Sequence, residues 1–239
     1  MREGLYGKVV LITGATGGLG SAVTREFART PTSLVLTARS QEKLERLVAE
    51  AGLSSARTLI VPADVTQADA VEHLANEVRT HYGRIDVLLN TAGGWRGGKP
   101  VWEAPLEEWD FMLALNLHSA FFLSRAVLPH MLEAGWGRIV HVSSKAAVAP
   151  RAKRAAYAVS KMGLITLTEI IAAEVKGTGV TANVILPSVI DTPANRASMP
   201  KADPSKWVPP ERIAATMQFL CSDAAESING ARVPVYGAV

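Results

Sequence analysis

Four polar side chains in the second half of the chain have the types and spacing for proton transfer: Asn116, Ser144, Tyr157 and Lys161. Tyr157 and Lys161 are four positions apart and therefore share one face of the helix predicted around them. A phenol with a pKa of about 10 exchanges protons poorly near neutral pH, but an adjacent ammonium group stabilises the phenolate and lowers that pKa. The pattern predicts that Tyr157 exchanges a proton with a substrate oxygen and that Lys161 lowers the pKa of Tyr157.

Ser144 lies thirteen residues before Tyr157, at the end of a strand predicted over 138–143. A hydroxyl in that place would hold a carbonyl oxygen and donate to it as negative charge develops. Ser143 is the rival, but strand alternation sends neighbouring side chains to opposite faces, so only one of the two serines serves. The spacing favours Ser144, and we expect Ser144 and Tyr157 to contact the substrate.

A glycine-rich turn, residues 13–20, comes directly after the first predicted strand. Glycine permits a tight turn and lets the backbone approach a ligand, and the helix that follows presents free N–H groups and the positive end of its dipole. The arrangement indicates a site for the pyrophosphate of a dinucleotide cofactor. The expected contacts are Gly14, Thr16, Gly17, Gly18, Leu19 and Gly20.

The second predicted strand is followed by Ala38-Arg39-Ser40. An acidic side chain there would bind the ribose 2′-hydroxyl of NAD(H) and repel a 2′-phosphate. Arg39 instead offers a planar fork of donors suited to phosphate. We therefore expect Arg39 and Ser40 to contact the cofactor, with NADP(H) favoured. If Arg39 is only an exposed strand-end residue, NAD(H) stays possible.

Short β-rich runs alternate with longer amphipathic ones along the whole sequence. Strands are predicted at 9–13, 34–37, 58–62, 87–90, 138–143, 181–186 and 232–236, and helices at 19–29, 41–51, 67–82, 107–133, 155–176 and 210–222. The alternation predicts one α/β domain over residues 1–239, a doubly wound Rossmann-type parallel sheet of seven strands with helices on both faces. Ligands of such sheets bind at the carboxyl edge, where the motifs fall. The proline-rich segment 187–210 is expected to be a substrate lid.

The spacing Thr-Gly-x-x-x-Gly-x-Gly and the Asn, Ser, Tyr and Lys set resemble the short-chain dehydrogenase/reductase family over essentially the whole chain. The resemblance implies that Lys161 also anchors the nicotinamide ribose and that Asn116 positions a water in a proton relay. Matching elements imply further cofactor contacts: Asp64, Val65, Asn90, Ala92, Gly93, Pro187, Ile190 and Thr192. The implied activity is hydride transfer between NAD(P)H and a small carbonyl or alcohol substrate, such as a ketone or a 3-oxoacyl ester.

Two loop segments are similar to those of dihydropteridine reductases: Gly93-Gly94-Trp95, and the stretch 191–207 that ends at Trp207. This local resemblance implies a quinonoid pterin as substrate, near Trp95 and Trp207. Arg39 and Ser144 depart from the pattern of those reductases, so a carbonyl reductase is the first interpretation and a pteridine reductase the alternative. A non-catalytic dinucleotide-sensing protein is an alternative of another class, disfavoured because Tyr157 and Lys161 are both present.

The composition of the sequence indicates the cellular compartment and disfavours some classes of binding partner. The one cysteine, Cys221, cannot form an internal disulfide, and no signal-peptide pattern opens the sequence, so a cytoplasmic protein is expected. Net charge is +3 with basic residues scattered among 22 acidic ones, which disfavours a nucleic-acid partner.

No uninterrupted apolar run approaches the roughly 18 residues of a membrane span. The five histidines lack ligand spacing, so no metal is expected. The family resemblance implies a homo-oligomer, a tetramer or a dimer.

Overall fold

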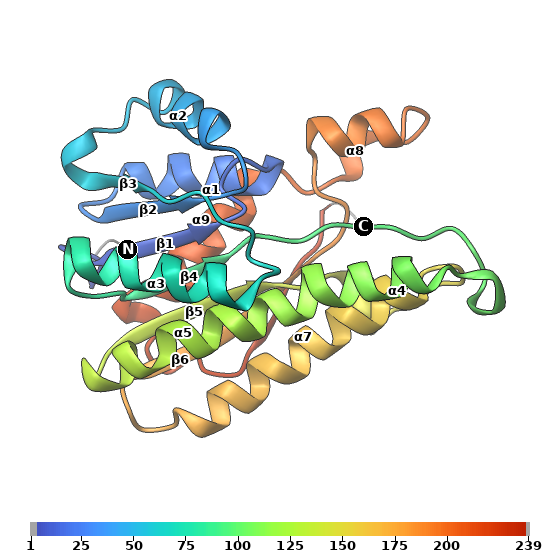
Figure 1. Cartoon of the computed structure of the whole chain (residues 1–239). Helices are drawn as coiled ribbons and strands as arrows, with labels where there is room; N and C mark the ends of the chain where they lie inside the picture. Colours follow the sequence, from blue (N-terminus) through green and yellow to red (C-terminus); the bar gives the residue numbers. More distant parts are fainter. Residues whose placement is uncertain (1–3, 238–239) are drawn as a thin grey trace.

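The structure, a computed structural model, describes residues 4–237. Seven strands form one all-parallel sheet in the order β3-β2-β1-β4-β5-β6-β7 (Figure 1). The strands are β1 (Val9–Thr13), β2 (Ser33–Thr37), β3 (Thr58–Ile60), β4 (Val87–Asn90), β5 (Gly137–Val142), β6 (Val180–Pro187) and β7 (Arg232–Val235). The winding reverses between β1 and β4, which places the ligand-binding crevice outside the carboxyl ends of these two strands. The predicted fold class is confirmed, and each predicted strand lies within two residues of an observed one.

Helices cover both faces of the sheet (Figure 1). One face packs against α1 (Gly18–Ala28), α2 (Gln41–Glu50) and α9 (Pro210–Cys221), and the other against α3 (Ala68–Tyr82), α5 (Ser119–Glu133) and α7 (Ala155–Glu174). Shorter elements are α4 (Leu106–Leu113), α6 (Lys145–Val148), α8 (Pro193–Ser198), the 3-10 turns η1 (Ser55–Arg57), η2 (Val101–Glu103), η4 (Pro204–Lys206) and η5 (Asp223–Ala225), and the π turn η3 (Ala114–His118).

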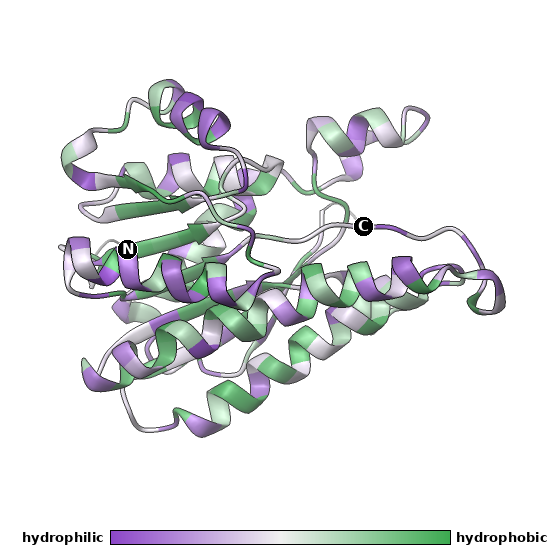
Figure 2. Cartoon of the chain, in the orientation of Figure 1, coloured by the Kyte–Doolittle hydropathy of each residue, from purple (hydrophilic) through white to green (hydrophobic). Residues whose placement is uncertain are grey.

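The strands are apolar because the helices bury both of their faces. Alternate residues of β1 enter different cores: Val10 and Ile12 join the α1 and α9 side, while Val9 and Leu11 join the α3 and α5 side. Figure 2 shows the hydrophobic residues concentrated in the strands and on the helices beside them. Cys221 lies within the first core, where burial raises the pKa of its thiol to about 12. This thiol is a packing residue and is unreactive at neutral pH.

Three features differ from the sequence-based expectation. The helix predicted over 107–133 is interrupted by the π turn that contains Asn116. Helix α6 was not predicted, because its four residues are too few to show helical periodicity. The predicted lid is more ordered than a loop, since it contains α8, a 3-10 turn and a bridge between Ile190 and Val208.

Two helical stretches, Leu106–Glu133 and Ala155–Glu174, are long and apolar enough to cross a membrane by length and composition alone. Both supply buried residues to the sheet: Leu123 and Val127 come from α5, and Ile171 comes from α7. Packing against the sheet therefore accounts for part of their apolar composition. The expected absence of a membrane partner stays a prediction.

Candidate active site

Ser144 and Tyr157 meet at the carboxyl end of β5. Ser144 caps α6 by accepting from the Ala146 N–H at 3.1 Å. Burial raises the pKa of the Tyr157 phenol, and this outweighs the opposing effects of the Ser144 hydroxyl and the positive charge of Arg154. The phenol is therefore protonated at neutral pH and can donate to an oxygen placed beside Ser144. Ser143 is engaged elsewhere, since its Oγ donates to the Lys161 carbonyl at 2.7 Å.

Lys161 lies one helical turn beyond Tyr157 on α7 and is 4 % exposed. Its Nζ donates to the Val142 carbonyl oxygen at 2.7 Å, and burial lowers its pKa to about 8. The sequence predicts a phenol whose pKa is lowered by Lys161, and the structure differs. Burial dominates at Tyr157, and Arg154 is the cation that acts on the phenol.

Asn116 is buried in the π turn, and its amide joins three segments. Its Oδ1 accepts from the Gly94 N–H at 3.0 Å, and its Nδ2 donates to the Gly94 carbonyl at 3.2 Å and to Ser160 Oγ at 3.1 Å. A Cβ at Gly93 would lie 3.0 Å from Lys161 Nζ and 3.1 Å from Asn116 Oδ1. A larger residue at position 93 would press on both side chains, so the loop after β4 passes directly beside both predicted catalytic residues.

The glycine-rich turn forms a narrow backbone cradle before α1. Gly17 precedes the helix without a side-chain cap, so N–H groups of the first turn are open to a ligand. A Cβ at Gly20 would lie 2.1 Å from the Gly14 carbonyl oxygen, and one at Gly18 would lie 2.6 Å from the Thr192 side chain. Gly14 has φ +64° and lies against the backbone of Ala92. The cradle, its free N–H groups and the helix dipole fit a dinucleotide pyrophosphate.

The other predicted cofactor residues near β2 and β3 occupy the same edge of the sheet. Arg39 is exposed and takes part in none of the ion pairs found among residues 4–237. Ser40 caps α2 by accepting from the Lys43 N–H at 3.3 Å. Asp64 Oδ1 accepts from the N–H and hydroxyl of Thr66 at 3.0 and 2.7 Å, which fixes the turn that also contains the buried Val65.

Asn90 belongs to a buried polar chain beneath the site. Its Oδ1 accepts from Thr13 Oγ1 at 2.7 Å, and its Nδ2 lies 3.2 Å from His141 Nδ1. His141 Nε2 lies 3.2 Å from Ser124 Oγ, so the chain links β1, β4, β5 and α5. Burial and the charge of Lys161 lower the pKa of His141 to about 3, which keeps the ring neutral. Sequence reasoning missed His141 and Ser124, although a lone histidine in an otherwise apolar strand is a recognisable signal.

The lid continues from Pro187, the last residue of β6, to the start of α9. Within it Ile190 bridges to Val208, and Thr192 caps α8 by accepting from the Asn195 N–H at 3.2 Å. Trp207 is packed inside the lid at 8 % exposure. Trp95, across the mouth in the loop after β4, is 52 % exposed and is therefore the more accessible of the two predicted substrate-binding rings.

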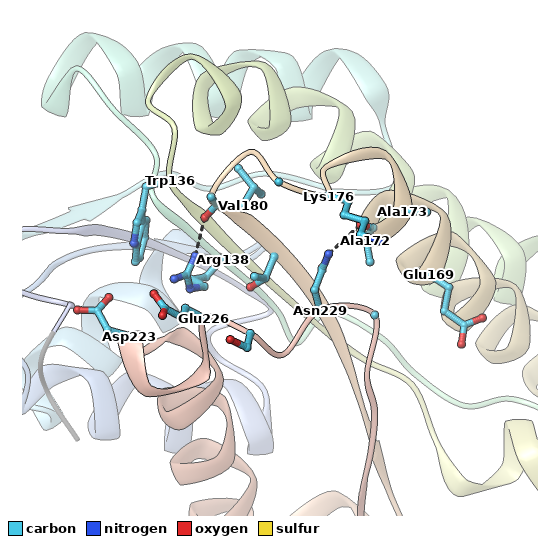
Figure 3. Close-up of a pocket in the computed structure, with 15 residues that line it drawn as sticks. Trp136, Arg138, Glu169, Ala172, Ala173, Lys176, Val180, Asp223, Glu226 and Asn229 are labelled. Carbon is cyan, nitrogen blue, oxygen red and sulfur yellow. Dashed lines mark hydrogen bonds between the residues drawn. The ribbon is translucent and has the colours of Figure 1, made fainter.

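A hollow of about 930 Å³ lies at the opposite edge of the sheet. It surrounds the amino ends of β5 and β6 and is lined by Trp136, Arg138 and Thr181, among others (Figure 3). The Arg138 guanidinium donates to the carbonyls of Gly137 and Gly179 at 2.8 and 2.9 Å. None of the predicted site residues lines this hollow. Volume alone does not locate the chemistry of this protein.

Comparison with known proteins agrees with the geometry at the carboxyl edge. The sequence model described as short chain dehydrogenase matches residues 8–203. The chain is 37 % identical over 242 residues to D-threitol dehydrogenase of Mycolicibacterium smegmatis, covering 98 % of this chain and 93 % of the relative. It is 32 % identical over 241 residues to a 3-oxoacyl-[acyl-carrier-protein] reductase of Thermotoga maritima, covering 98 % of each.

Among solved structures, a tryptophan variant of actinorhodin polyketide ketoreductase with NADPH superposes with a TM-score of 0.89 at 27 % identity, covering 97 % of this chain and 96 % of the other. None of these three relatives is a dihydropteridine reductase, and that local resemblance stays a prediction. The chain belongs to the short-chain dehydrogenase/reductase family and is an NAD(P)-dependent oxidoreductase that acts on CH–OH groups.

Proposed function

We propose that this protein reduces a small ketone or a 3-oxoacyl ester with NADPH, using Tyr157 as proton donor. The observation that carries the proposal is that the Lys161 ammonium, one helical turn beyond Tyr157 on α7, donates to the Val142 carbonyl two residues before Ser144. The nicotinamide, when bound, supplies the hydride to the carbonyl carbon. Ser144 holds the carbonyl oxygen, and Tyr157 gives it a proton as the carbon–oxygen π electrons move onto oxygen.

The raised pKa of Tyr157 suits the direction of reduction, because the phenol carries its proton at neutral pH. The Lys161 ammonium, charged below about pH 8, faces the same edge and would bind the ribose of the cofactor. Tyr157 would recover its proton from solvent. Asn116, whose amide already joins Gly94 and Ser160, would position the water of that relay.

Arg39 supports a preference for NADPH. Its guanidinium is exposed at the strand end beside the cradle and has no carboxylate partner among the ion pairs of the described residues. A guanidinium whose N–H donors are not engaged by a carboxylate can bind the 2′-phosphate of NADPH. The solved relative that is described with NADPH agrees with this choice.

The first experiment follows cofactor oxidation at 340 nm with NADPH and NADH in parallel. The panel contains simple ketones, a 3-oxoacyl thioester, a quinone and a quinonoid dihydropterin. Turnover of ketones or oxoacyl esters with NADPH is the expected result. Selective turnover of the pterin would favour the pteridine alternative instead, with the exposed Trp95 ring as its stacking surface.

Cofactor preference is tested with Arg39→Ser, and Arg46→Ser on the exposed side of α2 is the matched control. We expect the ratio of kcat/KM with NADPH to that with NADH to fall by about tenfold or more in Arg39→Ser, since a charged hydrogen-bonding pair is worth roughly 1.5–3 kcal/mol. The control variant should keep the wild-type ratio. An unchanged ratio in Arg39→Ser would remove the role given to Arg39.

We further propose a homo-oligomer in solution, a dimer or a tetramer. Helix α7 packs against α4 and η3, which lead into α5. Helices α5 and α7 expose Phe121, Val159 and Ile170 at 49, 47 and 50 %. Leu164 and Ile171, in contrast, are core residues. Sedimentation velocity tests the proposal, and a monomer at micromolar concentration would contradict it.

A further inference from the structure

Two loops at the mouth of the site carry positive charge without acidic residues. The loop after β4, residues 94–102, and the segment 145–156 between β5 and Tyr157 contain no Asp or Glu. Together they carry six cationic side chains: Arg96, Lys99, Lys145, Arg151, Lys153 and Arg154. The whole chain is nearly balanced, with 25 basic and 22 acidic residues, so this is a local excess of charge. One of the two loops, residues 145–156, connects Ser144 to Tyr157.

The two loops are held against each other. The Gly98 N–H donates to the Lys153 carbonyl at 2.9 Å, and a Cβ at Gly97 would lie 2.9 Å from that same oxygen. Lys153 has φ +66°, the one left-handed backbone among non-glycine residues 4–237. Such a conformation costs of order 1 kcal/mol and persists only where the surroundings enforce it. The contact fixes the backbone immediately before Arg154.

Three of the six cations, Arg96, Lys145 and Arg154, lie against aromatic rings and not against carboxylates. The Arg154 guanidinium lies 5.9 Å from the centre of the Trp95 ring, and that of Arg96 lies 3.6 Å from Phe111. Lys145 Nζ lies 4.7 Å above the Tyr236 ring. Within the described part of the chain, none of the ion pairs includes any of the six cations. A neutral ring orients a cation without neutralising it, so the charge remains available to an anion.

Arg154 is the cation nearest in sequence to the reacting phenol. It precedes α7 as its N-cap residue, three positions before Tyr157, and its charge reaches the phenol. A guanidinium offers paired donors that match the oxygens of a carboxylate or a phosphate. A ketone whose oxygen is held by Ser144 would therefore place a nearby anionic group against Arg154.

We propose that the substrate is a ketone carrying an anionic group, a carboxylate or a phosphate, and that Arg154 binds this group. The inference rests on the proposed carbonyl reduction and adds the substrate's charge and the residue that recognises it.

The test uses two matched pairs of ketones with NADPH: acetoacetate with its methyl ester, and dihydroxyacetone phosphate with dihydroxyacetone. The first pair tests a carboxylate and the second a phosphate. Arg154→Gln is the test variant, and Arg151→Gln, an exposed position in the same loop, is the matched control. Because the charge of Arg154 also acts on Tyr157, the readout is the ratio of kcat/KM for the charged and neutral members, in which that effect cancels.

We expect the wild type to prefer the charged member of at least one pair by tenfold or more. Arg154→Gln should bring that ratio close to one, mainly through KM, while Arg151→Gln should keep it. Equal or better turnover of both neutral members by the wild type overturns the inference and leaves carbonyl reduction standing. A ratio unaffected by Arg154→Gln also overturns it. Equal losses in the two variants would indicate a broad acidic partner, such as a carrier protein, and would overturn a single-residue site.

If neither pair is turned over, calorimetric titration of the full chain with NADP⁺ present decides the question. Acetoacetate or dihydroxyacetone phosphate should bind, and Arg154→Gln should weaken that binding by tenfold or more. Absence of binding by both anions, or binding that Arg154→Gln leaves unchanged, overturns the inference. Failure of the proposed function would show separately, as the absence of turnover for every ketone in the wider panel.

Discussion

The two ends of β5 are both polar, yet they differ in how their polar groups are arranged. At the amino end, Arg138 is 2 % exposed beside a hollow of about 930 Å³, with its Nε and the nearby Thr181 hydroxyl lacking partners among the described residues (Figure 3). At the carboxyl end, the buried Lys161, one helical turn beyond Tyr157, donates to the Val142 carbonyl two residues before Ser144. The residues expected to do the chemistry lie together at the carboxyl end, and none of them lines the hollow at the amino end.

The neighbouring serines offer the sharpest way to test this convergence. Ser144→Ala should lower kcat/KM by about 10²–10³-fold, since it removes a donor to the developing oxyanion. Ser143→Ala removes a hydrogen bond to the Lys161 backbone and should cost about 1 kcal/mol of stability with a much smaller loss of activity. Steady-state kinetics and thermal unfolding of both variants check the prediction. Equal losses of activity would contradict it.

The buried His141 of the polar chain beneath the site should make the free energy of unfolding depend on pH. His141 has a folded-state pKa of about 3, below the ordinary value, so the unfolded chain binds more protons between about pH 3 and 6.5. The free energy of unfolding should therefore fall by about 1.9 kcal/mol from this residue as pH drops from 7 to 5, a factor of about 25 in the folding equilibrium.

Urea unfolding at pH 7 and pH 5 measures this effect. His141→Asn should lose the pH-dependent part, whereas His118→Asn, on an exposed position of the π turn, should retain it. The same pH dependence in the wild type and in His141→Asn would show that other groups carry the effect.

Lys161 gives a smaller, graded effect on activity. Its folded-state pKa of about 8 lies below the ordinary lysine value, so the ammonium is present below pH 8 and is lost as pH rises. If this charge binds the cofactor, kcat/KM for reduction should fall tenfold per pH unit above pH 8. A pH profile measured from 6 to 10 checks this, and a flat profile would contradict it.

The fold could be predicted from the sequence because each strand is a short apolar run followed by an amphipathic helix, and burial on both faces enforces that pattern. The positions of Ser144 and Tyr157 follow from the same order, since β5 ends just before Ser144 and α7 carries Tyr157. The π turn at Asn116 could not be predicted, because its residues continue the helical pattern on both sides. Tertiary bonds from Asn116 to Gly94 and Ser160 span 22 and 44 positions of the chain.

The pKa of Tyr157 was the harder quantity to predict. Helical spacing places Lys161 on the same face as Tyr157. The direction of the shift in the Tyr157 pKa, however, depends on burial and on which group accepts the hydrogen bond from the Lys161 ammonium. In the structure Lys161 donates to the Val142 carbonyl, and burial prevails at the phenol. The direction of the pKa shift depends on the balance between desolvation and nearby charge, and this balance can be assessed only from a three-dimensional structure.

One measurement tests the contrast between the two ends of β5 most directly: kcat/KM with NADPH, at pH 7 and 340 nm, for Tyr157→Phe and Glu226→Gln, with the best ketone of the panel. Glu226 lines the hollow at the amino edge and is exposed. Tyr157→Phe should lose about 10³-fold or more, the upper range for a positioned proton donor, while Glu226→Gln should stay within about twofold of wild type. A Tyr157→Phe variant that keeps a tenth or more of wild-type activity would contradict the role of the phenol as proton donor.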